Sequence, residues 1–128
     1  MTRMTRFEIP EPTLLLNDWQ RMHWSQRRRY VRTLSWMVRV AIGVGGRTPM
    51  ERCYITIERH SAGLPDWDGL YGGMKGLLDC LVMQSKRNPH GLGLIRDDNP
   101  NCVISLTATP VKAPRGEGKT VVTIREAA

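Results

Sequence analysis

The chain has 128 residues, enough for one domain built around one hydrophobic core. Its 41% hydrophobic content is that of a globular protein, and it has no apolar run of about 18 residues, so no membrane span is expected. Lys and Arg number 19 against 12 Asp and Glu, a formal net charge of +7. That balance favours a polyanionic partner, unless the charge serves solubility alone.

The three cysteines, Cys53, Cys80 and Cys102, are widely spaced and match no zinc-binding motif. Each lies in an apolar run, so we expect buried free thiols, as in a reducing cytoplasm. The residues from Met1 to Arg6 lack the apolar core of a signal peptide. We therefore expect a cytoplasmic protein that needs neither zinc nor an organic cofactor.

The first third of the chain predicts a short strand, an irregular arm and a helix. Residues 7–9 form the strand, and residues 1–13 as a whole are a flexible or edge-strand arm. The irregular arm covers residues 13–24, and its apolar anchors are Leu14, Leu15, Leu16, Trp19 and Trp24. Ser25 is a good N-cap for a helix that runs to about residue 41. Its apolar positions at helical spacing are Tyr30, Leu34, Met37 and Ala41.

The remaining two thirds predict three strands and a second helix. Residues 51–59 alternate as a half-buried strand, with Cys53, Ile55 and Ile57 on its inner side. The second helix covers residues 68–83, and a polar loop follows at 86–93. Strands at 101–109, with Ile104, Leu106 and Ala108 inward, and at 120–125 are joined by a basic turn as a hairpin. The fold class predicted for residues 1–128 is a single α+β domain, a mixed or antiparallel sheet packed with two main helices.

Acidic side chains gather around one lysine near this second helix: Asp66, Asp68, Lys75, Asp79, Asp97 and Asp98. At about 100° per residue, Lys75 and Asp79 fall within about 20° of Asp68 on one helical face. Asp66 follows Pro65 and belongs to an extended segment from which it can turn toward Asp68. The pair Gly72-Gly73 implies a kink or a close approach by a phosphate backbone or another chain. Alternatively, the helix breaks there, which would end the alignment.

Clustered carboxylates favour a hard divalent cation such as Mg²⁺, and Mg²⁺ held beside a lysine suits phosphodiester hydrolysis. Each part also has a structural reading. The Asp66-Trp67-Asp68 motif is a common helix cap, Asp97-Asp98-Asn99-Pro100 is typical of a turn, and Lys75 with Asp79 is an i,i+4 surface pair.

A run of arginines without intervening acids indicates phosphate binding: Arg21, Arg27, Arg28, Arg29 and Arg32. Trp19, Trp24 and Trp67 either anchor the core or stack on unpaired bases. His23 either packs or contacts a phosphate, and packing is favoured.

The acidic pattern resembles the RusA family of Holliday-junction resolvases, small endonucleases encoded by phages, prophages and bacteria. The matching motifs are Asp66-Trp67-Asp68, then Lys75-Gly76-Leu77-Leu78-Asp79-Cys80-Leu81, then Gly93-Leu94-Ile95-Arg96-Asp97-Asp98. The resemblance extends from about Leu14 to Ile124 and includes the arginine-rich helix. Two features depart from the family pattern: Gly69 stands where the family has asparagine, and the spacing from Asp68 to Lys75 is longer than in the best-known member.

The resemblance implies an α+β homodimer, encoded by a phage or prophage in a bacterial host, that cuts four-way DNA junctions with Mg²⁺, for which Mn²⁺ can substitute. It assigns Asp66, Asp68 and Asp98 as catalytic metal ligands and Lys75 as the catalytic lysine, with Asp79 and Asp97 in supporting roles. Only the resemblance decides between Asp97 and Asp98. Two alternatives stay open: a non-catalytic nucleic-acid-binding protein that keeps the fold, and a metal-dependent nuclease acting on flap or duplex DNA.

Overall fold

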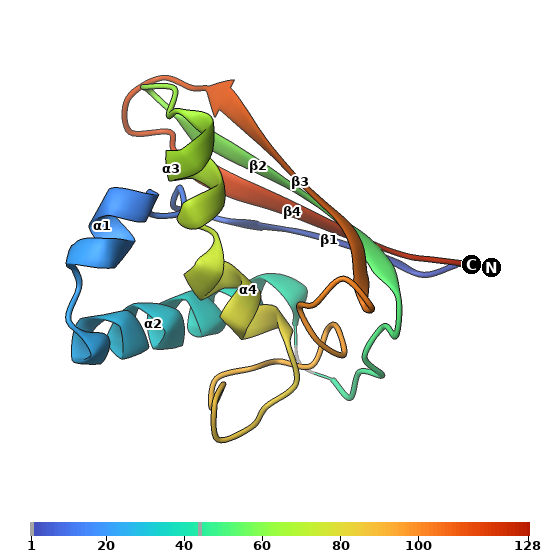
Figure 1. Cartoon of the computed structure of the whole chain (residues 1–128). Helices are drawn as coiled ribbons and strands as arrows, with labels where there is room; N and C mark the ends of the chain where they lie inside the picture. The colour runs from blue at the N-terminus through green and yellow to red at the C-terminus, as the bar shows by residue number, and fades with distance from the viewer. Residues whose placement is uncertain (1, 44) are drawn as a thin grey trace.

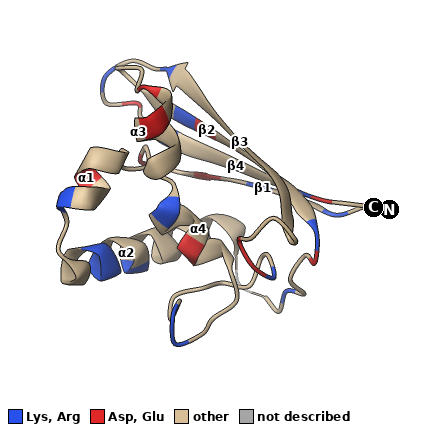
Figure 2. Cartoon of the chain, viewed as in Figure 1, with Lys and Arg blue, Asp and Glu red and all other residues tan. Residues whose placement is uncertain are grey.

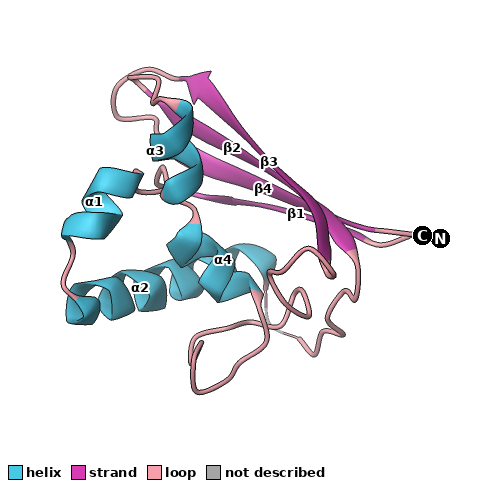
Figure 3. Cartoon of the chain, in the orientation of Figure 1, coloured by secondary structure: helices cyan, strands magenta, loops and turns pink. Residues whose placement is uncertain are grey.

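Strand β2 (Cys53–Ser61) is an inner strand of a four-stranded mixed sheet in the order β1-β4-β2-β3. The structure is a computed structural model that describes residues 2–43 and 45–128. The other strands are β1 (Met4–Ile9), β3 (Val103–Lys112) and β4 (Lys119–Glu126), and the helices are α1 (Leu16–Arg21), α2 (Trp24–Ile42), α3 (Trp67–Gly72) and α4 (Lys75–Leu81). The helices lie on one side of the sheet (Figures 1 and 3). The predicted α+β class, with one small domain and a mixed sheet, is confirmed.

The hydrophobic core lies between this sheet and the helices. Cys53, Ile55 and Ile57 of β2 are buried, as the alternating pattern predicted. Leu34 and Val38 supply the buried face of α2, whereas the predicted helical position Ala41 is exposed. None of the helices within residues 2–43 and 45–128 has both the length and the apolar content needed to cross a bilayer.

The predicted hairpin between the last two strands is wrong. Strand β2 lies between them, pairing in parallel with β3 and antiparallel with β4. Parallel neighbours need a long crossover, which is supplied here by the segment that carries α3 and α4. In β3 the predicted inward position of Ile104 is also wrong, because the register shifts beside Cys53 and leaves Ile104 exposed, while Ala108 is buried as expected.

The predicted helix over residues 68–83 is two helices, α3 and α4, separated at Gly73 and Met74. Both separating residues keep right-handed helical angles, but the Met74 N–H bonds to the nearer carbonyl of Tyr71 at 3.1 Å. A Cβ at Gly73 would lie 1.8 Å from the Leu14 carbonyl oxygen. The close approach that the glycine pair implies is therefore made by the chain's own N-terminal arm.

That arm is more ordered than predicted. Residues 16–21 form helix α1, and the Leu14 N–H donates to the hydroxyl of Tyr30 on α2 at 3.2 Å. The buried Arg59 of β2 donates from Nε to the carbonyl oxygen of Thr13 at 2.7 Å. Residues 1–13 include β1, an edge strand paired only with β4, so the edge-strand alternative is the one observed.

The predicted burial of the thiols is confirmed, since all three cysteines are free and buried. Burial raises the pKa of Cys53 and of Cys80 to about 12. Because the thiolate is the reactive form, we expect these thiols in the native protein to react with a disulfide reagent such as Ellman's far more slowly than in guanidinium-unfolded protein at the same mildly alkaline pH. If Cys53 or Cys80 of the native protein reacted with the reagent as fast as in the unfolded protein, this expectation would be contradicted.

Candidate functional site

Asp66 caps helix α3. Its backbone is extended, as predicted, and its Oδ1 accepts a hydrogen bond from the Gly69 N–H at 2.7 Å. A Cβ at Gly69 would lie 2.7 Å from the same Oδ1. Gly69, at the position where the RusA pattern has asparagine, therefore leaves room for this cap. The other carboxylate oxygen of Asp66 makes no hydrogen bond to the parts of the chain that the structure describes.

Asp68 stands in the first turn of α3 and is exposed, as are Asp66 and Trp67. An acidic residue is favourable there because the amino end of a helix carries partial positive charge. Both aspartates of the motif thus have a local structural reason, and both still present carboxylate oxygens to the surface.

Lys75 is the centre of a second group. Its ammonium lies 2.9 Å from Asp79 Oδ1 on the same helix and 3.9 Å from Asp98 Oδ2 in the loop that precedes β3. The Lys75 side chain is 52% exposed, that of Asp98 35% and that of Asp79 only 16%. A nearly buried carboxylate thus fixes the lysine, while the lysine and Asp98 stay accessible to a ligand.

The turn at residues 97–99 separates the roles of its two aspartates. Asp97 accepts hydrogen bonds from the Asp98 N–H at 2.7 Å and from Asn99 Nδ2 at 3.0 Å, the local bonding that is typical of a turn former. Asp98 faces Lys75 instead. The residues alone left open which of the two is a metal ligand; within the described residues, the Asp98 carboxylate lies near Lys75, while that of Asp97 is bonded inside the turn.

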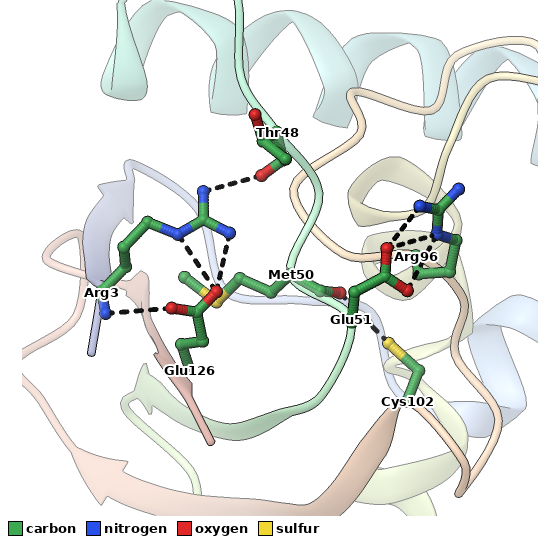
Figure 4. A network of polar contacts seen from close by, with 7 residues as sticks. All are labelled: Arg3, Thr48, Met50, Glu51, Arg96, Cys102 and Glu126. Atoms are coloured by element: carbon green, nitrogen blue, oxygen red, sulfur yellow. Dashed lines mark hydrogen bonds and ion pairs between the residues drawn. The ribbon is translucent and has the colours of Figure 1, made fainter. Parts of the chain in front are cut away.

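A polar network holds the start of this loop (Figure 4). Arg96 donates hydrogen bonds to both carboxylate oxygens of Glu51, and these bonds lower the pKa of Glu51. Met50 and Ile95 form a parallel bridge beside that pair. The Arg96–Glu51 pair thus ties the start of the 97–99 turn to the segment before β2. Sequence reasoning missed this pair, because the spacing of the two residues along the chain gives no local signal.

The two acidic groups are not merged into one metal centre. Within residues 2–43 and 45–128, no three His, Cys, Asp or Glu side chains are arranged to hold a metal ion. The helical count that placed Asp68 on one face with Lys75 and Asp79 does not hold, because α3 ends before Lys75. The structure brings together Lys75, Asp79 and Asp98, and it leaves Asp66 and Asp68 at the start of α3.

Helix α2 carries most of the arginine-rich surface, and Figure 2 shows this basic charge on its first half. Arg27 is tied to α1, donating from Nε to the Trp19 carbonyl at 3.0 Å and lying 5.1 Å from the centre of the Trp19 ring. None of the five predicted DNA-binding arginines forms an ion pair with any described residue, and four of them also make no side-chain hydrogen bond to one: Arg21, Arg28, Arg29 and Arg32. Their charge is available to a polyanion, whereas Arg27 serves the fold.

The start of α2 is capped by His23 rather than by the predicted Ser25. The His23 side chain accepts from the Ser25 N–H, and Gln26 bonds back to the His23 N–H at 2.9 Å. His23 thus has a structural role: it caps the helix, and its ring also packs beside that of Trp24, with the ring centres 5.4 Å apart. Trp24 is the first residue of the helix and is 64% exposed, so it is no core anchor, and Trp67 is equally open at 63%.

Comparison of the chain with known protein families and with curated proteins finds no match to either.

Proposed function

We propose that the chain is a magnesium-dependent endonuclease of the RusA type, which resolves four-way DNA junctions by hydrolysing phosphodiester bonds. The observation that carries the proposal is the meeting of Lys75 with Asp98 at 3.9 Å and with Asp79 at 2.9 Å. Lys75 and Asp98 are residues that the family pattern selects from separate parts of the chain. The proposal is further supported by the arginines on the first half of α2, since phosphate contacts supply most of the affinity for DNA.

Magnesium is part of this proposal, with Asp66, Asp68 and Asp98 as the residues that would hold it. Carboxylate oxygens are the donors that Mg²⁺ prefers, and the ion would supply charge neutralisation and an activated water. The three carboxylates are thus ligands of the type that Mg²⁺ prefers. Their arrangement would have to change for three of them to reach one ion, because they do not form one group within the described residues.

The chain's own residues have separate tasks in the proposed reaction. The Lys75 ammonium stabilises the charge that develops on the scissile phosphate, and Asp79 orients it through the 2.9 Å ion pair. Arg96, bound to Glu51, steadies the turn that presents Asp98. A homodimer would place two such sites about a two-fold axis, matching the symmetry of a four-way junction.

Incubation of the protein with a synthetic four-way junction and Mg²⁺ tests the proposal. We expect paired cuts near the branch point by the native protein and none by Asp68→Asn, which should fold and bind the junction normally because Asp68 is exposed. Flap and plain duplex substrates, compared at equal concentration, distinguish a resolvase from a nuclease of another class. No cleavage of any substrate by the native protein would overturn the enzyme proposal.

A non-catalytic nucleic-acid-binding protein is the second candidate. It is favoured by the ion pair of Asp98 with Lys75 and by the separation of that pair from the aspartates of α3. Calorimetric titration with Mg²⁺ or Mn²⁺ separates the two candidates. Asp66→Asn is a suitable variant because asparagine also caps helices well, so the helix should be kept while the negative charge is removed. Loss of metal binding in this variant would show that the carboxylate charge of Asp66 is needed, and would support the enzyme proposal. No binding by the native protein at millimolar metal would support the second candidate.

A further inference from the structure

A cavity of about 190 Å³ lies between the start of α2 and the loop of residues 84–91, next to Asp79. Trp24 and Arg28 of α2, Asn88 of the loop and Asp79 of α4 are among its lining residues. Asp79 is also the ion-pair partner of Lys75. The cavity therefore adjoins the site at which the backbone of DNA would be cut.

One wall of the cavity is an aromatic ring with a cation over one of its faces. Trp24 is 64% exposed, and the Arg28 guanidinium carbon lies 5.6 Å from its ring centre. Arg28 forms no ion pair within the described part of the chain. A flat ring beside an uncompensated guanidinium suits a planar aromatic ligand that carries a negative charge nearby.

The facing wall offers hydrogen bonds. The backbone of the 84–91 loop is well bonded: the Asn88 carbonyl accepts from Ser85 and Gly91, and the His90 carbonyl accepts from Ser35 Oγ at 2.8 Å. The side-chain amide of Asn88 is half-buried and makes no hydrogen bond to any described residue. An amide presents both donors and an acceptor, as the edge of a nucleobase does.

The volume limits the ligand. Pockets for drug-sized molecules measure roughly 300 to 1,000 Å³, so about 190 Å³ suits one heterocyclic base and is too small for a dinucleotide or an organic cofactor.

We propose that this cavity binds a single unpaired nucleobase of DNA, with Trp24 stacking on the base, Asn88 bonding to its edge and Arg28 contacting the adjoining phosphate. The inference rests on the proposed function for the nature of its ligand, and it names the feature of a branched substrate that would be recognised. Enzymes that act on unstacked bases combine stacking with hydrogen bonds in the same way.

The test compares a short single-stranded oligodeoxynucleotide with an abasic backbone of the same length, using fluorescence anisotropy in EDTA so that cleavage plays no part. We expect the native protein to prefer the oligonucleotide about tenfold, since stacking of one base contributes about 1–3 kcal/mol. Trp24→Ala should abolish that preference. Trp36→Ala is the matched control, because Trp36 is 66% exposed on the same helix but stands about 18 Å further along its axis and does not line the cavity.

The dependence of affinity on salt provides a second readout. Trp24→Ala should leave the slope unchanged, whereas Arg28→Ala should lower it by about one for both ligands, because only the arginine neutralises a phosphate. Equal effects of Trp24→Ala and Trp36→Ala, or no preference for bases in the native protein, would overturn the inference even where junction cleavage is observed. A base preference lost with Trp24 would sustain it even where cleavage fails.

Discussion

Gly73→Ala is expected to lower the free energy of unfolding by about 3 kcal/mol or more, the largest stability effect of any single methyl group that we anticipate in this protein. A Cβ at this position would lie 1.8 Å from the carbonyl oxygen of Leu14 and 2.7 Å from its carbonyl carbon. Both are backbone atoms of a packed segment, so no side-chain rotation relieves the overlap. Forced overpacking of a core typically costs about 1–3 kcal/mol, and more where the backbone must move.

The conformation of Gly73 makes the substitution a purely steric test. Its φ of −77° and ψ of −6° are open to alanine, so backbone strain makes no contribution. Gly46→Ala is the matched control, because a Cβ there would meet nothing within 4 Å and glycine-to-alanine changes at compatible sites are neutral or stabilise by about 0.4–1 kcal/mol. Urea unfolding of both variants measures the difference. Equal midpoints would show that the arm does not pack on the α3–α4 junction.

The same contact explains why the second helix could not be predicted correctly from the sequence. The apolar stripe over residues 68–83 is locally helical, and both halves do form helices. The break at Gly73 depends on Leu14, which is far away in the chain. A helical period reports which face is buried, but not which distant segment presses against that face.

Elements whose determinants are local were predicted well. The alternation of Cys53, Ile55 and Ile57 identified β2 and its buried face. The helix predicted over residues 25–41 is α2 with one more residue at each end. Strand order is the opposite case: β3 and β4 follow one another along the chain, yet β2 lies between them. The inner face of β2 is buried from Cys53 to Arg59, but no local pattern in β3 or β4 indicates that another strand separates them.

In the candidate site, too, the features that depend on neighbouring residues could be predicted, and those that depend on distant segments could not. The three structural readings available from the sequence are all observed: Asp66 is a helix cap, Asp97 is a turn former, and Lys75 pairs with Asp79 four residues along the helix. The contact of Lys75 with Asp98 was not accessible to spacing rules, because it depends on how the crossover returns the loop to α4. A local structural role for a residue does not exclude a functional role for the same residue. Asp66 uses one oxygen for its cap, and the Asp98 carboxylate, although 3.9 Å from Lys75, accepts no hydrogen bond from the residues that the structure describes.

Lys75→Ala is expected to reduce junction cleavage about 100- to 1,000-fold while strengthening the binding of Mg²⁺. The loss of rate follows from removing a cation aimed at developing negative charge, which typically costs that factor. The gain in metal affinity follows from Coulomb's law, because Asp79 and Asp98 would keep their charges and lose the positive group that now lies 2.9 Å and 3.9 Å from them. Single-turnover cleavage measures the first effect and calorimetric titration the second.

The opposite signs of these effects are what identify a catalytic lysine. A merely structural Lys75 would hold α4 and the 97–99 turn together, so its loss would loosen the site and weaken metal binding and cleavage alike. Lys86→Ala is the control for net charge, since Lys86 is an exposed residue of the loop that follows α4 and should change neither quantity beyond a small effect on DNA affinity. Lys75→Arg should restore part of the rate, because it keeps the charge but not the compact ammonium. If Lys75→Ala weakened the binding of Mg²⁺, the lysine would be assigned to the structure of the loop and the role proposed for it in cleavage would be withdrawn.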